Sequence, residues 1–234
     1  VAKLASLLHG EPTHRLKLVG ITGTNGKTTT TYLLEAICAA AGLKAGVIGT
    51  VGYRFAGKTL EATHTTPDPI ELQRLFAEML AEGVETVAME TSSHALEQRR
   101  VEACDYSVAA FTNLTQDHLD YHGTMEAYGE TKARLFTEYA PQHSVVMVDT
   151  DFGRGLATRA SGQVQRCSMG RVSDAEICVR DFRSSRSGLW ARIRTPEGEL
   201  TIDSPLFGAH NLENLLITIG CARALGIDGA SITE

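Results

Sequence analysis

The 234-residue chain has few cysteines, no long hydrophobic run and no excess of positive charge. Its five cysteines are scattered and form no C-x-x-C pair, which excludes a disulfide framework and a zinc site and fits reduced thiols. Because it has no apolar stretch of about 18 residues and no signal-like N-terminus, we expect a soluble, cytoplasmic protein without membrane insertion. The net charge of −6 argues against a nucleic-acid or membrane-surface partner.

The composition is otherwise that of an ordinary globular protein, with 43% hydrophobic and 21% charged residues. In the first part of the chain predicted strands alternate with predicted helices, which indicates a parallel sheet covered on both faces. From Ile177 a period of two predicts antiparallel strands at 177–182, 188–195 and 199–202. The predicted fold class is α/β, a P-loop-type, mostly parallel sheet with helices on both faces and a small antiparallel β subdomain towards the C-terminus.

The chain is organised around a predicted strand, glycine turn and helix at residues 16–34. The turn, residues 22–28, reads TGTNGKT. Backbone N–H groups of such a turn and the start of the following helix attract phosphate. Lys27 would reach the β- and γ-phosphates, and the Thr28 hydroxyl would hold Mg²⁺. Ile21 stands where the common phosphate loop has glycine, so this loop is a variant. The alternative, an ordinary glycine-rich turn before a helix, does not explain Gly-Lys-Thr at this junction.

Glu90 follows a predicted buried strand at 86–89, where open α/β sheets place their ligands. It is either a carboxylate that meets Mg²⁺ or a solvated acid at a strand end, and the phosphate loop favours the first interpretation. Ser93 and His94 come three and four residues later. They suggest a hydrolase nucleophile, but the G-x-S-x-G turn of that class is absent, which argues against it.

Two further positions carry open alternatives. Asp117 and His118 form either a metal-ligand pair or part of an ordinary polar loop, since neutral imidazole ligates metals readily. Lys132 lies on the apolar stripe of a helix predicted at 124–139. It either extends its ammonium to solvent or is desolvated with a lowered pKa.

Four motifs together resemble the central ATPase domain of the Mur ligases, the amide-forming ligases of peptidoglycan precursor synthesis. They are the turn at 22–28, ETSSH at 90–94, FTNLTQDHLDYHG at 111–123 and GAHN at 208–211. The match covers nearly the whole chain. Within the family, HTTP at 64–67 and the run 90–100 resemble the members that add a diamino acid, meso-diaminopimelate or L-lysine, to UDP-MurNAc-L-alanyl-D-glutamate.

The resemblance implies a site for ATP, a UDP-MurNAc-dipeptide and two Mg²⁺ ions. The implied ATP-binding residues are Gly23, Thr24, Asn25, Gly26, Lys27, Thr28, Thr29, Asn113, His210, Asn211 and Asn214. The implied substrate-binding residues are His64, Thr65, Thr66, Ser92, Gln98 and Arg100. Thr28 and Glu90 would hold one Mg²⁺. His118 would hold the second together with Lys132, which is carbamylated in the family. The implied catalytic residues are Lys27, Lys132, His118 and Glu90.

The implied chemistry is phosphoryl transfer from ATP to a substrate carboxylate, followed by attack of an amine on the acyl phosphate. By the same resemblance, residues 1–15 are the remnant of an N-terminal domain or linker. Residues 16–234 are the central domain, with an antiparallel insert at 172–206, and a C-terminal domain is missing. We therefore expect a monomer that needs both missing domains for turnover.

Three alternatives stay open. Another ligase with this central domain, such as folylpolyglutamate synthase or a cyanophycin-type ligase, would use the same loop for a different substrate. A P-loop kinase or nucleotide-binding regulatory module would need no conjugating substrate, and Lys132 would then be an unmodified lysine. A third reading is a chain that binds nucleotide without turnover.

Overall fold

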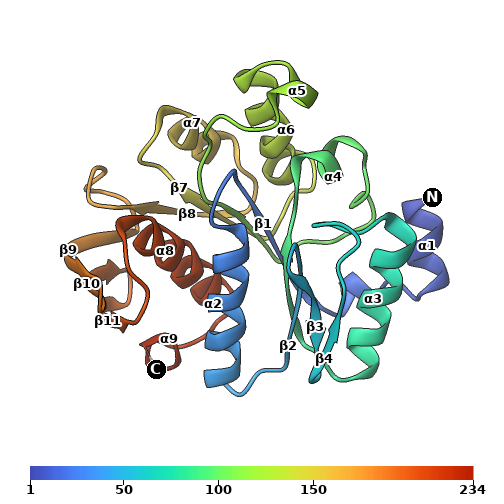
Figure 1. Cartoon of the computed structure of the whole chain (residues 1–234), viewed down its shortest axis with the longest axis horizontal. Coiled ribbons are helices and arrows are strands. Elements are labelled where there is room, and N and C mark those ends of the chain that lie inside the picture. The colour runs from blue at the N-terminus through green and yellow to red at the C-terminus, as the bar shows by residue number, and fades with distance from the viewer. Residues whose placement is uncertain (234) are drawn as a thin grey trace.

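One sheet of 11 strands runs through the described residues, 1–233, of the computed structural model (Figure 1). The strands lie in the order β11-β10-β9-β8-β7-β6-β1-β5-β2-β3-β4. The parallel part consists of β2 (Ala45–Gly49), β5 (Thr86–Glu90), β1 (Lys17–Thr22), β6 (Val108–Phe111), β7 (His143–Met147) and β8 (Gln163–Ser168). Glu234, the last residue of the predicted central domain, lies outside the described residues.

The chain order around β1 fixes the edge at which a ligand can bind. From β1 the chain passes to β2 and returns to β5 on one side, then crosses to β6 on the other side. Such a reversal of strand order opens a crevice beyond the carboxyl ends of the strands. The segments that follow β1, β5 and β6 therefore meet at one place.

Helices cover both faces of this sheet, as the sequence predicts (Figure 1). Along β1, Val19 and Ile21 face one core and Leu18 faces the other. The first core includes α2 (Lys27–Ala40) and α8 (Ala209–Ala224). The second includes α3 (Pro69–Ala81), α6 (Met125–Thr137) and α7 (Asp151–Arg159). Burial on both faces explains why the central strands are almost continuously apolar.

Local signals set several boundaries. Asp68 caps α3 by accepting hydrogen bonds from the backbone N–H groups of Ile70 and Glu71, with Pro69 at the first helical position. The hairpin of β3 (Gly52–Phe55) and β4 (Lys58–Leu60) turns at Gly57, whose φ is +76°. The sequence alone predicts Asp68 as a helix N-cap followed by Pro69, and a hairpin or loop that turns at Gly57; the structure confirms both predictions.

The shorter helices lie mostly outside the two cores. They are α1 (Ala2–Leu8), the 3₁₀ helix η1 (Pro12–His14), α4 (Ser93–Glu97), α5 (Leu119–His122) and α9 (Gly229–Thr233). The sequence predicts a turn at 92–94, where α4 begins, and a polar loop at 115–123, where α5 lies. Among the helices of residues 1–233, none combines the length and the hydropathy needed to span a bilayer.

The strands predicted as antiparallel are present as β9 (Ile177–Ser185), β10 (Gly188–Thr195) and β11 (Gly198–Ser204). They extend the main sheet at one edge, because Cys167 and Ser168 of β8 pair in parallel with the first two residues of β9. Since only these two residues of each strand are in register, β9 to β11 project beyond the carboxyl ends of the parallel strands.

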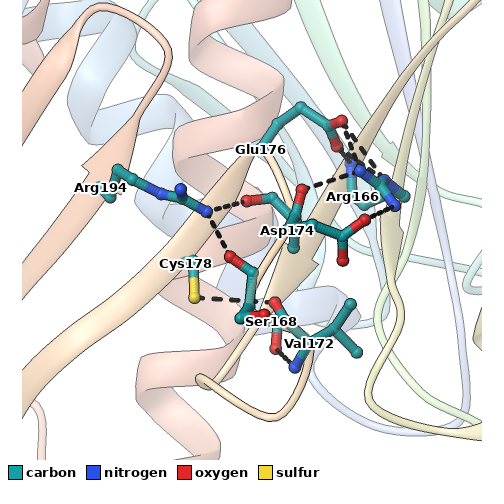
Figure 2. Close-up of polar contacts among 9 residues, drawn as sticks. Arg166, Ser168, Val172, Asp174, Glu176, Cys178 and Arg194 are labelled. Carbon is teal, nitrogen blue, oxygen red and sulfur yellow. Dashed lines mark hydrogen bonds and ion pairs between the residues drawn. The ribbon is translucent and has the colours of Figure 1, made fainter.

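The loop that joins β8 to β9 is held by two arginines (Figure 2). Arg166 on β8 donates to the carboxylates of Asp174 and Glu176 at 2.8–3.3 Å. Arg194 on β10 donates to the backbone oxygens of Ser173 and Ala175 at 2.8 and 2.7 Å. These contacts fix the direction in which the antiparallel strands leave the parallel sheet.

Candidate functional site

A cavity of about 520 Å³ lies at the carboxyl ends of β1, β5 and β2, where the strand order reverses. Its lining is mostly polar and comes from five separate segments of the chain. The lining residues are Thr24, Asn25, Gly26, Lys27, Thr28, Thr50, His64, Thr65, Thr66, Glu90, Ser92, His94, Arg100 and His118. Most of the residues implied for ATP phosphates and for substrate thus line one cavity.

The glycines of the loop after β1 are required by close approach as well as by backbone conformation. Gly23 has φ +144°, and a Cβ atom on it would lie 1.9 Å from the Thr112 hydroxyl oxygen. Gly26 has φ +87°, and a Cβ atom there would lie 2.1 Å from Oδ1 of Asn214. No side chain of residues 1–233 caps the start of α2, so its first N–H groups are available to an anion.

Asn113, which follows β6, holds this loop from the side. Its backbone oxygen accepts the N–H of Thr24, and its Oδ1 accepts the N–H of Asn25, both at 2.9 Å. Thr112 Oγ1 donates to the Asn25 oxygen at 2.6 Å. Asn113 therefore shapes the phosphate loop together with Thr112, which was not among the residues implied for ATP.

Lys27 folds back over its own loop. Its Nζ donates to the backbone oxygens of Gly23 and Thr24 at 2.9 and 2.8 Å. Burial lowers the pKa of the Lys27 ammonium, while the carboxylates of Glu90 and Asp117 oppose that shift. A phosphate would offer charged acceptors in place of the two carbonyls.

Glu90 and Thr28 meet, as predicted for one cation site. The Glu90 carboxylate is 1% exposed and accepts the Thr28 hydroxyl at 2.8 Å. It also accepts the backbone N–H of Thr50 at 3.0 Å and the Thr50 hydroxyl at 3.2 Å. Thr50 directly follows β2, and Glu90 is the last residue of β5. The place of Thr50 at the carboxyl end of a strand was the one sequence signal that could have identified it. Carboxylate and hydroxyl oxygens are the ligands Mg²⁺ prefers, so these residues fit that ion.

Lys132 is buried, which makes the solvent-directed alternative wrong. The side chain is 1% exposed, and Nζ donates to the Gly23 oxygen at 2.9 Å and lies 4.2 Å from the centre of the Tyr128 ring. Burial lowers its pKa to about 6; the nearby Lys27 adds to the shift and Asp117 opposes it. At neutral pH its amine is mostly uncharged.

His118 lies at the rim of the same cavity, with its side chain 48% exposed. Asp117 Oδ1 accepts the His118 backbone N–H at 2.9 Å, and His118 has φ +51°. Across residues 1–233, no three His, Cys, Asp or Glu side chains gather as a metal site. The joint ligation of a cation by His118 and Lys132 stays a prediction.

The residues implied for substrate form a connected network beside Glu90. Thr66 Oγ1 donates to the Glu90 backbone oxygen at 2.8 Å, and Thr65 Oγ1 lies 3.0 Å from Thr50 Oγ1. Arg100 donates to the Thr66 oxygen at 2.9 Å and to the Gln98 Oε1 at 2.6 and 2.9 Å. Gln98 does not line the cavity and instead orients Arg100.

Three of the residues implied for ATP, His210, Asn211 and Asn214, lie on the first turns of α8. Asn214 is buried against Gly26, and its Nδ2 lies 3.3 Å from the Asn211 Oδ1. Asn211 Nδ2 donates to the Phe207 oxygen at 2.9 Å. Thr29, His210 and Asn211 do not line the cavity, so their part in binding stays a prediction.

Comparisons with known proteins agree with this architecture. The profile of the Mur ligase middle domain matches residues 21–222. The UDP-N-acetylmuramoyl-L-alanyl-D-glutamate–2,6-diaminopimelate ligase of Geobacter sulfurreducens is 44% identical over 97% of this chain and 46% of that protein. A solved structure of a ligase of the same name has a TM-score of 0.90 at 29% identity, covering 99% of this chain and 49% of that one.

A more distant likeness concerns the fold alone. Folylpolyglutamate synthase of Mycobacterium tuberculosis, complexed with ADP and AMPPCP, has a TM-score of 0.79 at 18% identity, covering 99% of this chain and 60% of that one. The chain spans about half the length of the curated relatives it matches.

Proposed function

Since this chain belongs to the Mur ligase family through its middle domain, we propose that it is the ATP-binding part of an ATP-dependent ligase. The proposed reaction adds a diamino acid, meso-diaminopimelate or L-lysine, to UDP-MurNAc-L-alanyl-D-glutamate. The observation that carries this proposal is the single cavity that joins the phosphate loop and Glu90 to Thr65, Thr66 and Arg100. A kinase or regulatory module has no need of the second group of residues.

In the first step a carboxylate oxygen of the dipeptide attacks the γ-phosphorus of ATP. The bond from that phosphorus to its bridging oxygen breaks, and ADP leaves. Lys27 would exchange its two loop carbonyls for phosphate oxygens and would neutralise charge on the transferred group. Mg²⁺ held at Thr28 and Glu90 would supply further charge neutralisation.

In the second step the amine nitrogen attacks the acyl carbon, phosphate leaves with the acyl oxygen, and the amine loses a proton. Arg100 is suited to hold an anionic part of the substrate, because Gln98 and Thr66 fix its guanidinium beside the cavity. Thr65, Ser92 and His64 would add hydrogen bonds on the same side.

We further propose that Lys132 reacts with carbon dioxide to form a carbamate. The neutral amine adds to the carbon, releases one proton and becomes an anionic oxygen donor suited to Mg²⁺. The buried site and the pKa of about 6 support this step, because a free amine is present at neutral pH. One N–H remains on the carbamate and can still donate to the Gly23 oxygen.

The domain arrangement is also a proposal. Residues 1–15 would connect the central domain, 16–234, to a preceding domain, and a further domain would complete the site. Within 1–15, α1 packs through Ala2 and Ala5 and leaves Leu4, Leu7 and Leu8 exposed. The proposed protein is a cytoplasmic monomer.

The deciding experiment measures ADP release by the full-length gene product that contains this chain. We expect release to require both UDP-MurNAc-L-alanyl-D-glutamate and a diamino acid, with the amide product identified by mass. Release that depends on a folate and glutamate would favour a folylpolyglutamate synthase. Release that needs no amine acceptor would favour a kinase and contradict the proposal.

A further inference from the structure

The hydroxyl of Ser93 pairs with the imidazole of His122, and not with that of its sequence neighbour His94. The Ser93 Oγ lies 2.9 Å from Nε2 of His122, 29 residues along the chain. On the other side of the ring, Nδ1 of His122 lies 3.4 Å from a carboxylate oxygen of Glu97. Ser93 and Glu97 are the first and last residues of α4, and His122 is the last residue of α5.

The chemistry of the three groups sets the direction of these contacts. The Glu97 carboxylate can only accept, so the proton of a neutral His122 ring belongs on Nδ1. Nε2 then accepts the Ser93 hydroxyl. This order, serine to histidine to carboxylate, is also that of a hydrolase triad.

Burial argues against a nucleophile here. Ser93 is 2% exposed and the His122 side chain is 2% exposed, and neither lines the cavity. His94, the neighbour in sequence, is the one that lines it. An acyl substrate cannot reach the Ser93 oxygen, so the contact connects two structural elements.

Those two elements carry residues of the two halves of the cavity. Ser92 is the N-cap of α4 and belongs to the substrate side. His118 is the N-cap of α5 and lies on the same cavity. None of the four α5 residues is buried as a whole, so α5 is held by contacts of its side chains with α4 and α6. Tyr121 packs 4.2 Å from the His94 ring and accepts a hydrogen bond from Gln98 at 3.3 Å. The His122 ring packs 5.1 Å from the Tyr128 ring of α6 and also pairs with Ser93.

We propose that His122 is a positioning residue that fixes the segment of His118 against α4, and thereby sets the cation side of the cavity against the substrate side. This inference rests on the proposed function for its catalytic consequence, though not for its structural one. Without the bridge, the segment 115–123 would open more often, since a local opening is limited by the few contacts that close it.

The first test uses this chain without ligands. Amide hydrogen exchange is followed in the peptides that cover 115–123. We expect about tenfold faster exchange in Ser93→Ala and His122→Ala, because one buried hydrogen bond is lost. The matched control is His14→Ala, which removes a histidine paired with Asp105 elsewhere on the molecule and should leave 115–123 unchanged.

The second test measures steady-state kinetics of the full-length gene product with the same variants. We expect kcat to fall about tenfold and half-saturation by Mg²⁺ to shift upward, while KM for ATP changes less, because the loop at 22–28 hydrogen-bonds this segment at Thr115, the end remote from His122. The double variant Ser93→Ala/His122→Ala should lose no more than His122→Ala alone, as expected for two ends of one contact. Glu97→Gln, at an exposed position, tests the other side of the ring without risk to folding.

Unchanged exchange in 115–123, or an equal loss in His14→Ala, would overturn the proposal. Labelling of Ser93 by a serine-directed fluorophosphonate would also overturn it, and would assign a nucleophile instead. If the wild-type gene product shows no ligase turnover, the proposed function fails, and the exchange experiment still decides on the bridge.

Discussion

Replacing Lys132 by methionine should stabilise the folded chain while removing a proposed catalytic group. The folded state holds this amine at a pKa of about 6, against 10.5 for an unperturbed lysine. Between these values the unfolded state binds the proton and the folded state does not, so burial of Lys132 costs stability. At pH 7 that cost is about 5 kcal/mol, from about 1.4 kcal/mol for each pH unit below 10.5.

Methionine removes this cost and keeps an unbranched apolar chain of similar length. The variant loses the hydrogen bond from Nζ to the Gly23 oxygen, about 1 kcal/mol, and some contact with the Tyr128 ring. We therefore expect Lys132→Met to raise the free energy of unfolding at pH 7 by about 3 kcal/mol. The gain should be largest below pH 6 and should shrink as pH rises towards 10.5.

Urea denaturation from pH 6 to 10, in buffers free of carbon dioxide, measures this difference. Lys58→Met is the matched control, since Lys58 is exposed and ion-paired with Glu82, and it should give no gain that varies over this range. Added bicarbonate should stabilise the wild type alone if the carbamate forms. A variant that is no more stable than the wild type at pH 7 would refute the reasoning.

Three further outcomes follow from the site. Lys27→Ala should weaken ATP binding at least about 100-fold in calorimetry with an unchanged circular dichroism spectrum, because within residues 1–233 its amine donates only to loop carbonyls. Retained affinity would exclude the loop as the nucleotide site. Gly23→Ala should lower the free energy of unfolding, measured in denaturant, by about 2 kcal/mol or more, because its Cβ would collide with Thr112. The control Gly57→Ala has open space around its Cβ at φ +76° and should lower it by about 1 kcal/mol. The isolated chain should form little amide product with lysine or meso-diaminopimelate, since closure by other domains usually completes such sites; robust turnover would make those domains dispensable.

The sequence by itself determined the features that depend on near neighbours in the chain. The loop at 22–28 could be recognised because glycine supplies the positive φ that a tight turn before a helix needs. Asp68 and Pro69 likewise predicted the start of α3, because an N-cap carboxylate and a proline at the first helical position are local signals. Apolar strands at regular intervals predicted a sheet buried on both faces.

Elements with mixed patterns were harder to predict. The strand β8 carries Gln163, Gln165 and Arg166, so its polar residues conceal the strand period. The antiparallel strands were predicted, but their place at the edge of the main sheet depends on two backbone pairings with β8 that no local pattern encodes.

The tertiary structure alone decided several contacts that no local pattern predicts. Thr50 reaches Glu90 across 40 residues, Asn214 reaches Gly26 across the sheet edge, and His122 reaches Ser93. The contacts of Thr50 and His122 follow from the strand order around β1, which brings distant loops to one edge, and the approach of Asn214 to Gly26 follows from the packing of α8 beside α2. The residue type determines which groups a side chain can bind, whereas the tertiary fold determines which groups lie close enough to it. For Lys132 the sequence left two alternatives, and its burial under the loop, which removes the water that would solvate an ammonium, decided between them.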